Sequence, residues 1–115
     1  GLWIGPGKAR PSEPVDADLL RRAIREEKKL DLAYADGSGR SSRRTVWPIA
    51  LAFFEHVRIL VAWCELRDGF RHFRVDRMSD ARLLDVRYPR RRRTLVKDWR
   101  AVEIGRTARQ TADGN

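Results

Sequence analysis

Three arginines at regular spacing, Arg71, Arg74 and Arg77, are the residues with the clearest chemical potential in this sequence. A guanidinium group offers a flat pair of N–H donors that suits phosphate oxygens, and it also stacks on nucleic-acid bases. In a strand, side chains alternate between the two faces, so Arg71 and Phe73 would share one face while Arg74 would lie on the other. The pattern indicates a surface for a phosphate-bearing ligand. The same spacing also fits a buried Phe73 beside arginines that are solvated or paired with nearby aspartates.

No catalytic or metal-binding motif accompanies these arginines. The two histidines, His56 and His72, are not spaced with other ligand-type residues as a metal site requires, and one cysteine, Cys64, excludes an intramolecular disulfide. Cys64 stands in the most apolar stretch, which favours a core position. No glycine-rich phosphate loop and no nucleophile–base arrangement are recognisable. We therefore expect a protein that is not an enzyme and that needs no cofactor or metal.

The positive charge is concentrated in the second part of the chain. The sequence has 25 Lys and Arg against 16 Asp and Glu, a net charge of +9. Residues 1–39 contain 7 basic and 7 acidic side chains, whereas residues 40–115 contain 18 and 9, so the whole surplus of 18 − 9 = 9 falls there. A basic surface attracts polyanions, which makes nucleic acid the expected class of partner. For the arginine run at residues 90–93, a solvated helix entrance is the favoured interpretation.

The hydropathy pattern predicts a helix, five strands and a second helix. Asp16 is a candidate N-cap for the first helix. Strand patterns of period two follow, separated by turn residues such as those at 36–39. Pro48 lies inside the second strand pattern and requires an edge position or a bulge there. The expected elements are a helix at 16–29, strands at 30–35, 43–54, 57–66, 70–75 and 81–88, and a helix at 94–102.

These elements predict a mainly β fold with flanking helices, in one domain. Five short antiparallel strands close most readily into a small barrel, because closure removes exposed edges. No stretch is apolar and long enough for a transmembrane helix and no signal peptide is recognisable, so a cytoplasmic location is expected. We expect a linker from a missing upstream domain at 1–15, the β-barrel domain with its leading helix at 16–88, a basic helical segment at 89–104 and a flexible tail at 105–115.

Residues 60–67 and 70–78 together resemble the WYL domain, and more closely the WYL domain of YafY-type bacterial transcriptional regulators. The similarity extends to residues 24–30, 44–51 and 88–90, so it covers roughly residues 16–100. One departure is conspicuous, since Arg58-Ile59-Leu60 stands where the family has Trp-Tyr-Leu. Only the leucine is retained, and Arg58 adds a cation in place of an aromatic ring.

The resemblance implies a five-stranded SH3-like (Sm-like) β-barrel that senses an effector. In such regulators an N-terminal helix-turn-helix domain binds operator DNA, and the WYL domain is associated with negatively charged ligands, single-stranded DNA in particular. Because only one helix precedes the strands, we expect this chain to be the sensor half of a regulator, which binds single-stranded nucleic acid to modulate transcription. The expected ligand-binding residues are Arg71, Arg74, Arg77, His72, Arg43, Arg44, Trp47 and Arg58.

Two alternatives remain open from the sequence. In the first, the same basic pocket senses a nucleotide-type small molecule. In the second, the domain is an oligomerisation module, which makes the chain a candidate for a homodimer. At the residue level, Trp47 fits a stacking platform for a base and a core aromatic next to a bulge equally well.

Overall fold

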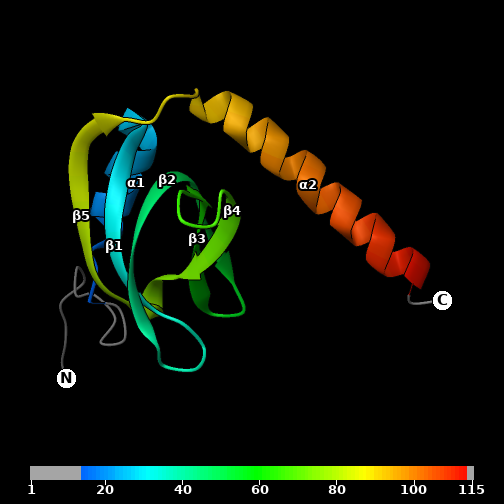
Figure 1. Ribbon diagram of the computed structural model, residues 1–115, viewed down its shortest axis with the longest axis horizontal. Coiled ribbons are helices and arrows are strands. Elements are labelled where there is room, and N and C mark those ends of the chain that lie inside the picture. Colours follow the sequence, from blue (N-terminus) through cyan, green and yellow to red (C-terminus); the bar gives the residue numbers. More distant parts are fainter. Residues whose placement is uncertain (1–13, 114–115) are drawn as a thin grey trace, which may run out of the picture.

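The computed structural model describes the backbone of residues 14–113 and the side chains of residues 14–106. One helix precedes a five-stranded sheet and one follows it (Figure 1). This confirms the predicted mainly β fold and the order of its elements. The elements are α1 (Ala17–Glu26), β1 (Lys28–Ala35), β2 (Ser41–Phe54), β3 (Val57–Cys64), β4 (Gly69–Arg74), the 3-10 helix η1 (Val75–Arg77), β5 (Met78–Arg87) and α2 (Arg92–Asp113).

The first helix begins where its cap residue predicts and ends earlier than expected. The Asp16 carboxylate accepts a hydrogen bond from the backbone N–H of Asp18 at 2.9 Å, which satisfies a donor that the helix itself leaves open. Glu27 adopts the left-handed conformation with φ of 56°, and its N–H bonds back to the carbonyls of Ala23 and Ile24. Because this cap terminates α1, Lys28 and Lys29, which the sequence predicts to be helical, belong to β1 instead.

The five strands form one antiparallel sheet in the order β4-β3-β2-β1-β5. The sheet is open, and within the described residues no pairing joins β4 to β5. A closed barrel, the arrangement that the sequence predicts, is therefore not supported. The short helix η1 turns the chain between the two strands, which lie at opposite edges of the sheet (Figure 1).

The longest strand, β2, connects the two parts of the sheet. Its first half pairs with β1 as far as Val46, and its second half pairs with β3 from Val46 to Phe54. The β2–β3 register shifts between Pro48 and Ala50, which confirms the predicted irregularity at the proline. Pro48 lies beyond the last residue of β2 that pairs with β1, in a stretch of β2 whose one printed strand neighbour is β3, and such an edge position tolerates a proline.

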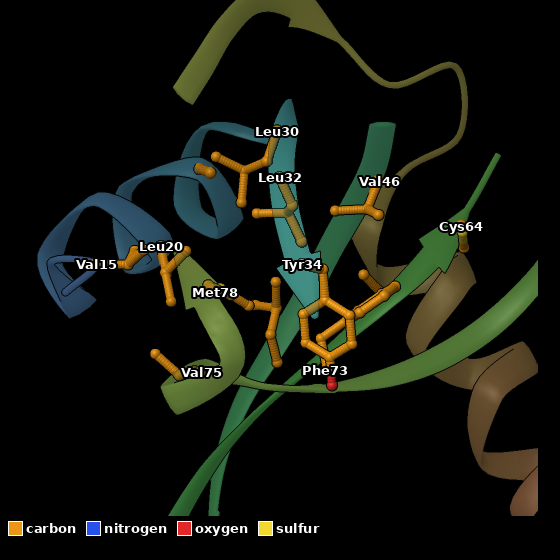
Figure 2. Packing of buried hydrophobic residues seen from close by; sticks show 13 residues of the cluster. Val15, Leu20, Leu30, Leu32, Tyr34, Val46, Cys64, Phe73, Val75 and Met78 are labelled. Atoms are coloured by element: carbon orange, nitrogen blue, oxygen red, sulfur yellow. The ribbon is translucent and has the colours of Figure 1, made fainter. Parts of the chain in front are cut away.

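Two apolar clusters cover the two faces of the sheet. The face that packs on α1, here called the α1 face, carries residues such as Leu32, Val46 and Phe73 (Figure 2), which are almost completely buried. Tyr34 packs edge-on against Phe73 with ring centroids 5.0 Å apart. Cys64 is fully buried in this cluster, which confirms its predicted core position.

The opposite face, here called the α2 face, is covered by the first turns of α2. Leu95 of α2 is buried against Val61, Ile49 and Tyr88, and the Tyr88 hydroxyl donates to the Pro48 carbonyl at 3.0 Å. The helix is longer than expected, since it continues through residues 105–113, and its C-terminal end projects away from the sheet (Figure 1). No helix in the described part of the chain is both long and apolar enough to cross a membrane.

Candidate ligand-binding surface

The strand β4 distributes its basic residues over both faces of the sheet. Phe73 lies opposite Leu60 on the α1 face and is buried, whereas Arg71, two residues earlier, lies opposite Ala62 on the same face and is exposed. The Arg71 guanidinium bonds only to the neighbouring Phe70 carbonyl, at 2.7 Å. Arg71 thus extends the buried row of β4 into solvent. It also lines a hollow of about 360 Å³ with Phe70, His72, Glu103 and Arg106, but it forms no ion pair with a described residue.

Arg44 lies on the same face as Arg71. It is two residues before Val46 in β2, and Val46 pairs with Cys64, which in turn pairs with Gly69 of β4. The Arg44 side chain donates to Ser42 Oγ at 3.1 Å and contacts Cys64 Sγ at 3.8 Å. Arg71 Nη1 lies 3.6 Å from the position that a Gly69 Cβ would occupy. Both guanidinium groups therefore stand around the Cys64–Gly69 pair, and neither forms an ion pair with a described residue.

Arg74 lies on the other face, as the alternation of the strand predicts, and it is already paired. Its guanidinium donates two hydrogen bonds to the Asp76 carboxylate, at 3.0 and 2.7 Å. These bonds hold the pKa of Asp76 below and raise the pKa of Arg74 above their ordinary values. The pair reduces the charge that Arg74 presents to a ligand. Arg77, in η1, reaches the β1–β2 turn, since its Nη1 lies 3.7 Å from the position of a Gly37 Cβ.

Arg43 is separated from Arg44 by the alternation of β2. Its guanidinium lies 3.0 Å from Asp31 and 3.8 Å from Asp80, and Arg82 approaches Asp31 at 3.2 Å. The hydrogen bond from Arg43 holds the pKa of Asp31 below its ordinary value. The structure therefore does not bring Arg43 together with Arg44 and Arg71.

Trp47 and His72 belong to an aromatic layer on the α2 face. The Trp47 ring stacks on Trp63 and Tyr88, with centroids 5.7 and 6.2 Å away, and its indole N–H donates to Glu65 at 2.8 Å. His72 accepts a hydrogen bond from the indole N–H of Trp99 in α2, at 3.0 Å. These contacts hold Trp47 in the packing between sheet and helix, whereas His72 contacts Trp99 but remains exposed.

Arg58 lies at the end of β3 remote from Cys64, next to Ile59, which pairs with Arg74. With Arg21, Leu51, Ala52 and Phe53 it lines a hollow of about 330 Å³. The predicted site residues thus fall into several places, and Arg44 and Arg71 are the two that share one face without a carboxylate partner.

A second basic surface escaped prediction. A cleft of about 730 Å³ lies between α1 and the start of α2. One wall contains residues of the arginine run at 90–93, which the sequence assigns to a solvated helix entrance. For the other wall, the sequence offers only the spacing of Arg21 and Arg25, which places both on one side of α1. The lining residues are Arg21, Ile24, Arg25, Glu27, Ala50, Leu51, Arg91, Arg92, Arg93 and Thr94.

Within the described residues, no group of three or more His, Cys, Asp or Glu side chains could hold a metal ion. The chemistry that the arrangement offers is the recognition of anions by guanidinium groups.

Comparison with known proteins gives this surface a context. The family model of the WYL domain matches residues 17–83. No curated protein matches the sequence. Among solved structures, proteasome accessory factor B/C (PafBC) of Arthrobacter aurescens has a similar fold, with a TM-score of 0.65 and 23% identity over 75% of this chain. The chain spans only 14% of the length of that protein, so the likeness concerns the fold of one part of it.

Proposed function

The chain belongs to the WYL domain family, and on this premise we propose that it is the ligand-sensing domain of a bacterial transcriptional regulator and binds single-stranded nucleic acid on its sheet. In this proposal the chain is the sensor half of a regulator of the YafY type. A helix-turn-helix domain upstream would then bind operator DNA. Binding of the ligand alters that contact only to the extent that the ligand prefers one arrangement of the two domains over another.

The placement of Arg44 and Arg71 is the observation that carries the proposal. Both guanidinium groups stand on the α1 face around Cys64 and have uncharged partners only. Other basic residues of the sheet, such as Arg43 and Arg74, are close to aspartates. A guanidinium without a carboxylate partner keeps its full charge for a phosphate and needs no ion pair to be broken first.

The position of β4 at the edge of the sheet gives the ligand a path. A single strand that crosses this edge would meet Arg71 on one face and Arg74 on the other, whereas Arg77, in η1, reaches the β1–β2 turn. The bidentate bond to Asp76 holds the Arg74 guanidinium in one orientation. In this arrangement Arg44 and Arg71 provide the electrostatic attraction, and the paired Arg74 contributes a positioned donor.

A double substitution tests the proposal. Replacing Arg44 and Arg71 by alanine should weaken the binding of a fluorescein-labelled oligothymidylate by about tenfold or more, because two charge-assisted contacts are lost. Fluorescence anisotropy at fixed, moderate salt measures the affinity, and circular dichroism verifies the fold.

The variant Arg82→Ala/Arg87→Ala is the matched control. It removes the same charge from β5, at the other edge of the sheet, where both arginines lie near carboxylates. Its affinity should stay within about threefold of the parent chain, since only the long-range field changes. Equal losses in the two variants, or no loss in the first, would overturn the assignment of this surface.

A further inference from the structure

The cleft between α1 and α2 is a charged hollow that the proposed function leaves unused. Five arginines line it, against one carboxylate, that of Glu27. Arg90, at the start of the same arginine run, is paired with Asp98 and does not line the cleft. Within the arginine run, the cleft therefore receives Arg91, Arg92 and Arg93, and Arg90 does not contribute to its positive charge.

Glu27 holds one side of the cleft together and leaves the other side charged. Its carboxylate accepts from the backbone N–H of Arg92 at 2.9 Å and from the Arg91 guanidinium at 3.2 Å. The Arg92 side chain turns away from it and donates to the Ile49 carbonyl at 2.7 Å, so the charge of Arg92 is not neutralised by that bond. Within the described residues, Arg25 and Arg93 have no hydrogen-bond or ion-pair partner.

The rest of the lining is apolar. Ile24, Ala50 and Leu51 lie between the two arginine-bearing walls. Leu51 and Arg21 also line the neighbouring hollow, where they meet Phe53, a side chain that is 59% exposed. A ligand with an anionic group and a flat apolar body matches this arrangement, in which arginines lie next to apolar side chains. The volume of the cleft lies in the usual range for a small-molecule site.

We propose that this cleft binds a nucleoside phosphate, with the phosphate held between Arg25 of α1 and Arg92 and Arg93 of α2 and the base directed over Leu51 towards Phe53. The ligand would bridge the two helices, because each contributes part of the charge. The site is independent of the sheet surface around Arg44 and Arg71, so either proposal can fail while the other holds. Two sources offer the same chemistry, a free nucleotide and the phosphorylated end of a single strand.

Titration of the ¹⁵N-labelled chain with thymidine 5′-monophosphate (dTMP) tests the site. Saturable shifts should centre on the amides of Arg25, Leu51 and Arg93, and the Arg25→Ala/Arg93→Ala variant should bind dTMP about tenfold or more weakly. Because these two arginines have no hydrogen-bond or ion-pair partner among the described residues, the variant should keep its fold. The control Arg40→Ala/Arg67→Ala removes two exposed charges from turns outside the cleft and should bind dTMP as the parent chain does.

Further probes separate the parts and the sources of the ligand. Thymidine and inorganic phosphate should each bind at least about tenfold more weakly than dTMP, since each makes only some of the contacts. A 5′-phosphorylated oligothymidylate that binds more tightly than dTMP identifies the end of a strand as the source, and the reverse order identifies the free nucleotide. Absence of saturable dTMP binding, an unchanged affinity in Arg25→Ala/Arg93→Ala, or phosphate as strong a ligand as dTMP would each overturn the proposal.

Discussion

At the residue scale, the partner of each arginine decides what that arginine can do. Arg71 and Arg74 are three residues apart on one strand, yet the first has only a backbone carbonyl as its partner whereas the second has a bidentate carboxylate. Arg43 and Arg44 are neighbours with the same contrast. The four side chains are identical in type, but they differ in how available they are for a phosphate. The alternation of side chains along each strand places neighbouring arginines on different faces, next to different partners.

Trp47 provides a prediction at this scale, since the sequence allows it to be a base-stacking platform or a packing residue. The contacts with Trp63, Tyr88 and Glu65 favour packing. Trp47→Leu should lower the free energy of unfolding by roughly 1–3 kcal/mol, through the lost ring stacking and the lost hydrogen bond. Urea denaturation followed by circular dichroism measures the loss. The variant Trp47→Phe removes the N–H but keeps a ring, so its free energy of unfolding should lie between those of the parent chain and Trp47→Leu. If Trp47→Leu left the stability unchanged and weakened the binding of oligothymidylate, Trp47 would be a base-stacking platform and not a packing residue.

At the element scale, local sequence patterns predicted the helices and strands well, but they did not predict that the five-stranded sheet stays open. The cap at Asp16, the irregularity at Pro48 and the five strands follow from short-range rules of capping, pleating and turn formation. Whether β4 and β5 meet depends on the direction in which η1 turns the chain, and no local pattern encodes that direction. The cleft escaped prediction for a related reason, because it joins side chains of two helices that lie at opposite ends of the sequence.

Glu27 connects two elements and provides the prediction for this scale. Glu27 terminates α1, and its side chain, which is 15% exposed, binds the first turn of α2. The hydrogen bond from the Arg92 backbone N–H holds the pKa of the Glu27 carboxyl below its ordinary value. Glu27→Gln should lower the free energy of unfolding at neutral pH by roughly 1–2 kcal/mol. Because the pKa is lowered in the folded state, this stabilisation is complete above the ordinary glutamate pKa of about 4.3 and disappears as the pH falls through the folded value.

Denaturant unfolding of both chains at pH 7 and at about pH 3 measures this effect. The difference between the parent chain and Glu27→Gln should shrink at the lower pH. Glu26→Gln is the control, because Glu26 forms exposed contacts with Arg22 and Lys28 on α1 and β1 without reaching α2. It should cost less than Glu27→Gln at pH 7. A Glu27→Gln deficit that stays constant with pH would show that the carboxylate charge has no part in joining the helices.

At the scale of the whole molecule, the nine surplus charges resolve into separate surfaces. Many basic side chains lie near carboxylates. The arginines that carry the two proposals, Arg44 and Arg71 on the α1 face and Arg25 and Arg93 in the cleft, have no carboxylate partner among the described residues. Arg44 and Ala50, which mark the two surfaces on β2, are six residues apart, which is at most roughly 20 Å along a strand. A nucleic-acid strand of several nucleotides is long enough to span that distance.

The salt dependence of binding tests whether one strand uses both surfaces. Each phosphate contact on a single strand contributes about −0.7 to the slope of log K against log salt, because counterions are released. Arg44→Ala/Arg71→Ala should therefore reduce the steepness of the slope for oligothymidylate by about 1.4, and Arg25→Ala/Arg93→Ala should reduce it by a similar amount if the strand also enters the cleft. Anisotropy titrations over a series of NaCl concentrations give the slopes. A slope that changes only in the sheet variant would confine the strand to the β4 edge and leave the cleft to a free nucleotide, whereas a flat slope in the parent chain would exclude phosphate contacts as the basis of binding.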